Sequence, residues 1–346
     1  MNHIKVGNQI AGEGFPPLVI AEIGINHGGS LKEAKKLVDA AKHAGVKVLK
    51  HQTHIVEDEM SFHAKSIKPG NSNKPIYEIM KECALSERDE AQLRDYVIEQ
   101  NMVFISTPFS RAAVDRLERL EVPAYKIGSG ECNNYPLVEL IASIGKPIIL
   151  STGMNSLQSI QKSVDILRKY RVPFALLHTT NLYPTPHNLV RLGAMVELGK
   201  EFPDAVLGLS DHTVDNYACF AAVALGAKIL ERHFTDTKDR GGPDIANSMD
   251  PEQCQNLIEG SRIIFKELGG SKVPAEEERV TMNFAFASVV SVDEIRKGEV
   301  FSTKNVWVKR PGTGELLADR YSELIGKLAS VDIPRDHQIQ KTDVVW

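Results

Sequence analysis

Short apolar runs recur along the chain, each followed by a polar cluster and then by a stretch whose apolar positions repeat at helical spacing. Continuous apolar runs of this length are typical of strands that are buried on both faces, as in parallel sheets. We therefore predict eight strands, at 18–25, 46–53, 103–108, 124–129, 147–152, 174–180, 206–211 and 228–234.

Helical patterns lie between these strands, and several begin at a Ser or Asn that can cap a helix. The clearest are 30–44, 86–100, 111–120, 156–169 and 216–225. Strand–helix units that repeat eight times in about 270 residues predict an α/β fold, the (β/α)8 TIM barrel. A doubly wound sheet is the alternative, but no G-x-G-x-x-G motif follows the first strand, which argues against a dinucleotide site.

Three further segments complete the predicted organisation. The connection from Thr53 to Ser86 is longer than the others, and long loops over a barrel mouth are often functional. After a barrel domain at 1–268, residues 269–283 combine turn residues with charge and predict a linker. In the remaining domain, 284–346, short apolar segments between turns predict compact β structure with single helical turns. A domain of this size is marginally stable alone, so we expect it to pack on another surface.

Composition narrows the possible partners. The net charge of −4 over 346 residues provides no basic field for nucleic acid or an anionic membrane, which favours a small-molecule substrate. The four cysteines are widely spaced without a C-x-x-C pair, which argues against a structural zinc site and a disulfide framework. The chain begins without a secretory signal pattern, and no apolar run approaches the ~20 residues that span a bilayer. We expect a soluble, cytoplasmic protein.

Two histidines, His212 and His233, stand at the ends of the last two predicted strands. Strand ends at one face of a barrel carry its chemistry, so both imidazoles can converge on one ion. The alternative is two satisfied core histidines, but recurrence in consecutive units favours a metal site. Nearby carboxylates that can complete or orient such a site are Glu131, Asp211, Glu231, Asp236 and Asp244. This donor set suits Mn²⁺, Mg²⁺, Zn²⁺ or Fe²⁺.

Charged residues also lie inside apolar strands. Glu22 in the first strand is either a catalytic acid or base, a hydroxyl acceptor, or an ion-paired strand residue; Asn26 and His27 follow it as supporting candidates. Lys50 and Lys126, also inside strand-like runs, need an anion. Polar residues near strand ends that can help surround a phosphate or carboxylate are Ser129, Gly130, Ser151, Thr152, Asn181 and Ser210. Alternatively the lysines pair with glutamates such as Glu22, Glu131 or Glu231, or one forms a Schiff base.

At these residues the chain closely resembles the N-acetylneuraminate synthase family, the bacterial sialic acid synthases, and their relatives that make legionaminic acid. The matching stretches are Ile20–His27, Lys50–Met60, Ile105–Arg111, Tyr125–Asn134, Leu150–Met154, Gly208–Thr213, Leu230–Thr235 and Trp307–Gly312. The resemblance implies a (β/α)8 barrel followed by an antifreeze-like (SAF) domain, in a domain-swapped homodimer. It also implies condensation of phosphoenolpyruvate with N-acetylmannosamine and water, which gives N-acetylneuraminate and phosphate. The runner-up acceptor is 2,4-diacetamido-2,4,6-trideoxymannose, which leads to N,N'-diacetyllegionaminate.

The resemblance also implies residue roles. His212 and His233 would hold the divalent metal, typically Mn²⁺, with Mg²⁺ or Co²⁺ as alternatives. Phosphoenolpyruvate would be held by Lys50, Thr107, Lys126, Ser129, Ser151, Asn181 and Ser210. The sugar would be bound by Gln52, Asn71, Tyr183 and Asp244, with Arg310 from the small domain of a second subunit on its acyl group. Glu22, Glu131 and Glu231 would stand near the reacting centre, with Glu22 as the acid or base.

Three other hypotheses compete with this interpretation. A metal-dependent pyruvate aldolase on the same fold would release no phosphate. A non-enzymatic protein that binds ice or glycan through its last domain would leave the charged strand ends without a purpose. Within that domain, Lys304, Lys309 and Arg310 are alternatively a solvated basic face.

Overall fold

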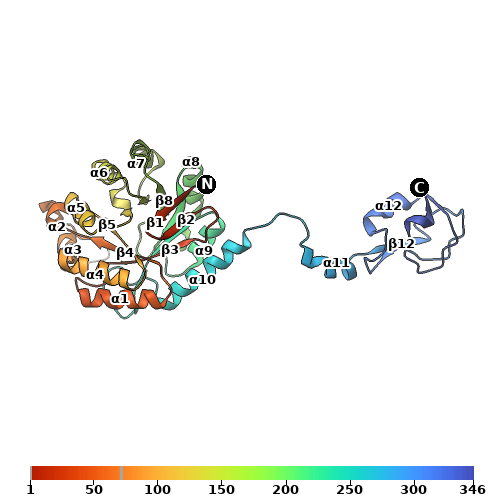
Figure 1. The fold of residues 1–346 in the computed structure, drawn as a ribbon, viewed down its shortest axis with the longest axis horizontal. Helices are drawn as coiled ribbons and strands as arrows, with labels where there is room; N and C mark the ends of the chain where they lie inside the picture. The colour runs from red at the N-terminus through yellow and green to blue at the C-terminus, as the bar shows by residue number, and fades with distance from the viewer. Residues whose placement is uncertain (1, 71–72) are drawn as a thin grey trace. The chain divides into compact units, whose positions relative to one another are not determined.

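The structure is a computed structural model that describes residues 2–70 and 73–346. The chain divides into two compact units, Met1–Gly269 and Gly270–Trp346. The first unit is a closed barrel of eight parallel strands in the order β10-β3-β4-β5-β6-β7-β8-β9 (Figure 1). These are β3 (Leu18–Gly24), β4 (Val48–Thr53), β5 (Val103–Pro108), β6 (Tyr125–Ile127), β7 (Ile148–Ser151), β8 (Phe174–Thr179), β9 (Val206–Asp211) and β10 (Ile229–His233). Each overlaps a predicted strand, so the barrel prediction is confirmed.

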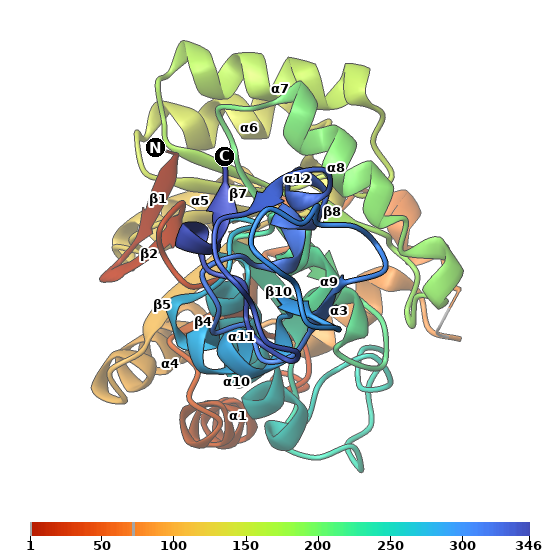
Figure 2. The same ribbon diagram turned by 90° about the vertical axis from the view of Figure 1, so that its right-hand side faces the viewer.

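The barrel strands alternate with helices that form an outer layer, which Figure 2 shows for α1, α4, α6, α7 and α8. The main helices are α1 (Leu31–His43), α4 (Glu87–Glu99), α5 (Arg111–Arg119), α6 (Tyr135–Ser143), α7 (Leu157–Lys169), α8 (Leu192–Glu201), α9 (Tyr217–Ala224) and α10 (Pro251–Glu267). Ser30, Ser86 and Ser156 accept hydrogen bonds from the third backbone N–H of their helices, as capping residues do. Asn216 stands at the N-cap position of α9, but its side chain makes no capping hydrogen bond and bonds to Arg232 and Gln253 instead.

Two segments lie outside the strand–helix repeat. The long connection after β4 contains α2 (Val56–Glu59), a 3-10 turn at Phe62–Lys65 and α3 (Ile76–Cys83), so it is largely helical. The chain begins with an antiparallel hairpin, β1 (His3–Val6) and β2 (Gln9–Gly12). Apolar side chains of this hairpin pack with the inward residues at the amino-terminal end of the barrel strands. The hairpin therefore covers one end of the barrel, which leaves the carboxyl ends of the strands to carry the chemistry.

Side chains alternate along each strand between the barrel interior and the helical layer. On β4, Leu49 packs outward into the large core beneath the helices, whereas Val48 joins the apolar cluster inside the barrel. Two residues further on, the next inward side chain is Lys50, which lines a cavity at the carboxyl end. The interior thus changes from apolar to charged within one inward step along the strand.

The second unit contains α11 (Arg279–Ala285) and the hairpin of β11 (Ser288–Ser291) with β12 (Val306–Lys309). A second short pair joins β13 (Leu328–Ala329) to β14 (Val344–Val345), and α12 (Tyr321–Leu324) is a single turn. Its small core is built around Phe301, Leu316 and Leu324. The segment from Arg279 is helical, although the sequence predicts a linker up to residue 283.

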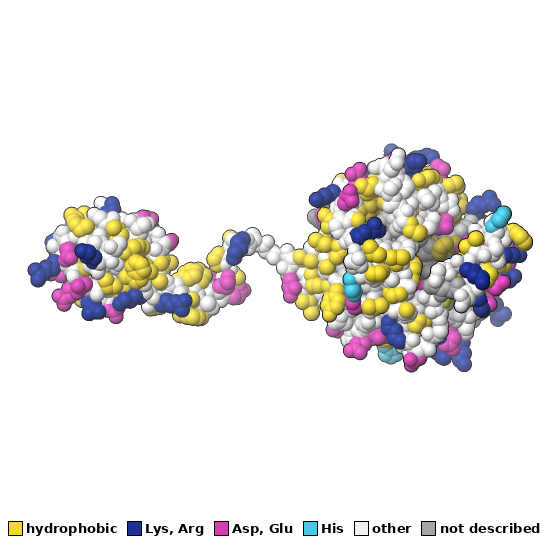
Figure 3. Space-filling view, turned by 180° about the vertical axis from the view of Figure 1, so that it is seen from behind, with side chains coloured by type: hydrophobic (Ala, Val, Ile, Leu, Met, Phe, Trp, Pro, Cys, Tyr) yellow, Lys and Arg dark blue, Asp and Glu magenta, His cyan; other side chains and the backbone are white. Residues whose placement is uncertain are grey.

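The surface of both units carries basic and acidic side chains close to one another, as the face in Figure 3 shows. Among residues 2–70 and 73–346, no helix is both long enough and apolar enough to cross a membrane.

Candidate active site

A cavity of about 150 Å³ opens at the carboxyl ends of the barrel strands. It is lined by Glu22, Lys50, Gln52, Thr107, Phe109, Lys126, Gly128, Ser129, Gly130, Ser151, Thr179, Asn181, Tyr183, Ser210, His212, Glu231 and His233. We call this the inner cavity. It brings together every residue predicted to hold phosphoenolpyruvate, both histidines, and two of the three carboxylates expected near the reacting centre.

Four buried charges occupy the floor of the inner cavity. Lys50 Nζ contacts Glu22 Oε2 and lies 3.8 Å from Glu231 Oε1, and Lys126 Nζ lies 3.5 Å from Glu231 Oε1. The lysine–glutamate pairs that the sequence left as an alternative are therefore present. Burial would lower the pKa of Lys50, but Glu22 and Glu231 outweigh burial and raise it. Burial lowers the pKa of Lys126 to about 8, against the opposing effect of Glu231.

The two glutamates differ in their electrostatics although they share Lys50. Burial, with repulsion from Glu231, raises the pKa of Glu22 to about 7, and Lys50 opposes the rise. For Glu231, burial would raise the pKa, but Lys126 and Lys50 outweigh it and lower the pKa. A pKa near neutrality suits proton transfer in either direction, whereas a lowered pKa keeps the carboxylate ionised. The electrostatics therefore suit Glu22 to proton transfer and Glu231 to remaining an anion beside both lysines.

Hydroxyl and amide groups surround the two ammonium groups. Lys126 Nζ donates to Ser151 Oγ at 2.6 Å, and Lys50 Nζ donates to Thr107 Oγ1 at 3.3 Å. Asn181 Oδ1 is buried without a hydrogen-bond partner. A Cβ at Gly153 would overlap the amide end of the Asn181 side chain, so a larger residue there would displace that side chain. Lysines with neighbouring hydroxyl donors are suited to the oxygens of phosphate and carboxylate.

The two histidines meet over the cavity with ring centroids 5.4 Å apart. His212 Nδ1 lies 2.9 Å from the carbonyl oxygen of Thr180, which makes Nδ1 the protonated nitrogen and leaves Nε2 as a lone-pair donor. His233 Nδ1 is buried without a hydrogen-bond partner and lies 3.7 Å from Asp244 Oδ2. Burial and the electrostatic interaction with His233 lower the pKa of His212 to about 4. Burial, reinforced by Lys50, lowers that of His233 to about 3.

These features fit a divalent cation. Metals bind neutral imidazole, and both histidines are held neutral with a nitrogen that no protein donor uses. Within the described ranges, no group of three or more His, Cys, Asp or Glu side chains is arranged to hold a metal ion. An ion between His212 and His233 would therefore take its remaining ligands from water or substrate.

A larger cavity of about 700 Å³ adjoins the first, and we call it the outer cavity. It shares Gln52, Asn181, Tyr183, His233 and Phe109 with the inner cavity. Its other lining residues are Ile25, His54, Glu59, Met60, Pro69, Gly70, Ile76, Ile79, Met80, Leu182, Pro243 and Asp244. The sugar-binding residues predicted from the sequence and placed by the structure in the barrel unit, Gln52, Tyr183 and Asp244, all line it. Burial raises the pKa of Asp244 to about 6.

A chain of polar contacts connects the two cavities. Gln52 Nε2 donates to Glu22 Oε1 at 2.9 Å, and its Oε1 lies 3.1 Å from His54 Nε2. His54 Nδ1 in turn lies 2.8 Å from Glu59 Oε2, and the His54 ring stacks on Phe109 with centroids 4.5 Å apart. The Gln52 side chain thereby bridges Glu22 in the inner cavity and His54 in the outer cavity.

Several predicted residues do not join the two cavities. Glu131 lines neither; its carboxylate accepts from Asn134 at 2.6 Å, and burial raises its pKa. Asn26 donates to the carbonyl of Phe234, and Thr152 donates to the carbonyl of Leu177, so both support the backbone. Asn71 lies outside the described residues.

Other predicted residues have partners away from the cavities. His27 stacks on His51, and Asp236 pairs with Arg240. Arg310 belongs to the second unit, where it is exposed; Lys309 beside it pairs with Asp336. The sugar-binding role of Arg310 stays a prediction.

Sequence reasoning missed three groups of residues that line or support the cavities. His54, Glu59 and four apolar residues of the outer cavity, Met60, Ile76, Ile79 and Met80, come from the connection after β4, where no periodicity marks which side chains face inward. The signal available was the spacing of His54 from Gln52, since residues two apart on a strand share a face. Arg232 was not singled out, although a buried arginine must have partners.

Comparison with known proteins gives consistent matches. Residues 37–273 match the model of the NeuB family, and residues 286–345 match the SAF domain. An uncharacterised protein of Methanocaldococcus jannaschii is 39% identical over 91% of this chain and 90% of its own length. The N,N'-diacetyllegionaminic acid synthase of Campylobacter jejuni is 37% identical over 94% of this chain and 99% of its own. The crystal structure of N-acetylneuraminic acid synthetase from Leptospira borgpetersenii, in complex with citrate, has a TM-score of 0.74 and 30% identity, covering 81% of this chain and 95% of that one.

Proposed function

Because the chain belongs to the NeuB family and is an enzyme of the sialic acid synthase type, we propose that it condenses phosphoenolpyruvate with an N-acylated hexosamine. The observation that carries the proposal is the pair of buried lysines, Lys50 and Lys126, among hydroxyl donors at the barrel mouth. A small dianion that carries both a phosphate and a carboxylate matches this pair. The inner cavity would hold phosphoenolpyruvate, and the outer cavity would hold the sugar.

The residues of the inner cavity would perform distinct tasks. Lys50 and Lys126 would bind the phosphate and carboxylate oxygens and orient the enol carbon C3 toward the sugar aldehyde. Glu22, with a pKa near neutrality, would exchange protons with the water that adds at C2 or with the new sugar hydroxyl. Glu231 would remain ionised and stabilise positive charge that develops at C2. The tetrahedral intermediate then loses phosphate by cleavage of its C–O bond, and neither lysine forms a covalent intermediate.

His212 and His233 would hold the divalent cation, for which we propose Mn²⁺, with Mg²⁺ or Co²⁺ as alternatives. The ion would polarise the aldehyde oxygen of the sugar and stabilise the alkoxide that develops there. The orphaned Nδ1 of His233 and the hydrogen bond that fixes the tautomer of His212 support this assignment. Asp244, whose Oδ2 lies 3.7 Å from His233 Nδ1, would accept a hydrogen bond from a sugar hydroxyl beside the ion.

For the acceptor we place 2,4-diacetamido-2,4,6-trideoxymannose ahead of N-acetylmannosamine, which the sequence put first. Apolar side chains from the connection after β4, Met60, Ile76, Ile79 and Met80, line the outer cavity and suit a C6 methyl and additional acetyl groups. The described residues that line it include no Lys or Arg but two carboxylates, Glu59 and Asp244, which disfavours a phosphorylated sugar. N-acetylmannosamine remains the second candidate, because the structure from Leptospira is similar over most of its length.

We further propose a domain-swapped homodimer in which Arg310 serves the barrel of a second subunit. The exposed side chain of Arg310 and the compact second unit are compatible with that role. Sedimentation of the full chain would give a dimer mass. Arg310→Ala would raise the KM of the sugar without changing that of phosphoenolpyruvate.

The proposal is tested by steady-state kinetics with purified full-length protein, Mn²⁺, phosphoenolpyruvate and each sugar. We expect phosphate release that depends on the sugar, with kcat/KM for the diacetamido sugar at least ~10-fold above that for N-acetylmannosamine. The reverse ratio would make N-acetylmannosamine the preferred acceptor and would leave the proposed reaction unchanged. Condensation without phosphate release, or with pyruvate in place of phosphoenolpyruvate, would reject the reaction in favour of a pyruvate aldolase.

A further inference from the structure

A buried arginine and aspartate lie directly behind the two histidines. Asp211 precedes His212 on β9, Arg232 precedes His233 on β10, and the two residues are register partners in the parallel pair. Their neighbours Ser210, Glu231 and both histidines face the inner cavity, so Asp211 and Arg232 face outward, toward the helical layer. Arg232 is 1% exposed and Asp211 is 3% exposed.

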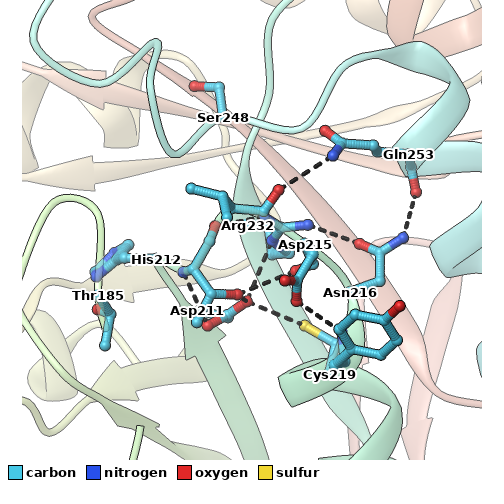
Figure 4. Close-up of polar contacts among 12 residues, drawn as sticks. Thr185, Asp211, His212, Asp215, Asn216, Cys219, Arg232, Ser248 and Gln253 are labelled. Carbon is cyan, nitrogen blue, oxygen red and sulfur yellow. Dashed lines mark hydrogen bonds and ion pairs between the residues drawn. The ribbon is translucent and has the colours of Figure 1, made fainter. Parts of the chain in front are cut away.

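The guanidinium of Arg232 connects the strand of His233 to the loop that follows His212. Its Nε lies 3.3 Å from Asp211 Oδ2, and its Nη1 donates to Asn216 Oδ1 at 2.6 Å (Figure 4). Its Nη2 donates to the carbonyl of Thr213 at 2.6 Å. Asn216 extends this hydrogen-bond network to α10, because its amide donates to the carbonyl of Gln253 at 2.8 Å.

Thr213, the residue after His212, is held from both sides. Its backbone N–H and its hydroxyl donate to the carboxylate of Asp211, at 3.1 and 2.7 Å, while its carbonyl accepts from Arg232. On the other side, the carbonyl of His212 accepts from the backbone N–H of Thr185 at 2.9 Å. The backbone is therefore fixed at the carbonyl of His212 and at the residue that follows it.

Stability alone gives a weak reason for such an arrangement. Burying two opposite charges costs about as much desolvation free energy as their attraction returns, and apolar replacements are often neutral. A planar guanidinium that donates to Asn216 and Thr213 beside the carboxylate of Asp211 does fix the geometry between β10 and the segment 211–216, since its donors have set directions. Groups that orient metal ligands commonly change metal affinity by ~10- to 100-fold when mutated.

We propose that Asp211 and Arg232 are positioning residues that set the separation of His212 and His233 and thereby the affinity of the site for a divalent cation. This inference rests on the metal assignment within the proposed function. The inference adds that metal affinity requires Asp211 and Arg232 as well as the two histidines. The strand of one ligand is tied to the loop of the other by a single side chain.

Arg232→Lys tests the proposal, because lysine keeps the charge but cannot bind Asp211, Thr213 and Asn216 together. The matched control is Arg116→Lys, since Arg116 also binds a buried carboxylate, Glu90 at 3.1 Å, and a backbone carbonyl, that of Leu85 at 3.2 Å. Arg116 lines neither cavity. Mn²⁺ alone is titrated into each full-length protein without substrate. Binding is followed by the electron paramagnetic resonance signal of free Mn²⁺ and by calorimetry, and thermal unfolding is recorded in parallel.

We expect Arg232→Lys to raise the Kd for Mn²⁺ by at least ~10-fold, and Arg116→Lys to change it less than ~2-fold even where it lowers the Tm. If Arg232→Lys does not fold, Thr213→Val decides. It removes one hydrogen bond to Asp211 and should raise the Kd by ~3-fold. An unchanged Kd in a folded Arg232→Lys protein, or an equal rise in Arg116→Lys, overturns the positioning role and leaves the proposed function intact. A wild-type protein that binds no Mn²⁺ overturns the metal assignment and the positioning role together.

Discussion

The two ends of the barrel interior are built from the same strands but from opposite kinds of side chain. Toward the amino-terminal end, the inward residues Ile20, Val48 and Ile149 belong to one apolar cluster. One inward position further along the same strands stand Glu22, Lys50 and Ser151, which line the inner cavity. Because strands have a period of two, each pair shares a strand and a direction and differs only in depth.

The difference shows how stability and chemistry are divided. The apolar end has close-packed side chains sealed by the β1–β2 hairpin, so it contributes to the free energy of folding. Burying the charges at the other end costs desolvation free energy. That cost is offset only by the pairing of Lys50 and Lys126 with Glu22 and Glu231. We therefore expect mutations at the charged end to change activity far more than stability, and mutations at the apolar end to do the reverse.

The largest effect is expected for Lys50→Met. Loss of the ammonium group removes a phosphoenolpyruvate contact and leaves Glu22 without its cation, so kcat/KM should fall by ~10³-fold or more. Removing one partner of a buried ion pair lowers the melting temperature, but the loss is limited because Glu22, with a pKa of about 7, can take up a proton. Phosphate-release kinetics and circular dichroism measure the two quantities. Lys146→Met, which removes a half-exposed partner of Glu118, is the control and should keep near wild-type activity. An active Lys50→Met enzyme would contradict the assignment of activity to the charged end of the barrel.

Ile149→Ala tests the opposite end. Ile149 is completely buried, and truncating it should lower the free energy of unfolding by ~2–5 kcal/mol through lost transfer free energy and a cavity. Below the unfolding transition, kcat/KM should stay within ~3-fold of wild type, because Ser151 keeps its place on the strand. Urea unfolding followed by circular dichroism gives the stability. A large loss of activity with unchanged stability would mean that the two ends are not separable.

A pH dependence sharpens the account of the charged end. Burial lowers the pKa of Lys126 to about 8, so its positive charge is present below pH 8 and is lost as the pH rises. At one unit below the pKa about nine-tenths of the lysine is charged and at one unit above it about nine-tenths is neutral, so the KM for phosphoenolpyruvate should rise by up to ~10-fold between pH 7 and pH 9. The melting temperature, measured over the same range, serves as the control for unfolding. A KM that stays constant over this range would exclude Lys126 as an anion-binding cation in its charged form.

The smallest effect is expected at the wall of the outer cavity. Met80→Gln keeps the length of the side chain but makes the wall polar, and should lower kcat/KM for the diacetamido sugar by ~5-fold relative to N-acetylmannosamine. Met154→Gln, at an exposed methionine that lines neither cavity, should leave the ratio unchanged. Equal losses with both sugars would indicate that the wall does not select between them.

The strands and the charged mouth were predictable because they depend on local rules. Apolar runs located the barrel strands, and residues at strand ends such as His212, Lys126 and Ser210 had to converge once the barrel closed. The sequence did not reveal that the pKa of Glu22 is raised and that of Glu231 lowered, since that depends on Glu231 lying beside both lysines and Glu22 beside Lys50. His54 and Glu59 were missed because they meet only through the fold of the connection after β4. The sequence suggested that the Asn216 side chain caps a helix. It could not show that a buried arginine binds this side chain instead, because the two residues meet only in the fold.

The most direct test of the central claim, that the charged end of the barrel condenses phosphoenolpyruvate with a sugar, follows one oxygen atom. Phosphoenolpyruvate labelled with ¹⁸O in the bridge between C2 and phosphorus is converted by the full-length enzyme with Mn²⁺ and the diacetamido sugar, and ³¹P resonance detects the label in phosphate. The account predicts one phosphate for each new C–C bond, with the label retained in the phosphate. Label that remains in the sugar acid, or a sugar acid formed without phosphate, would contradict it.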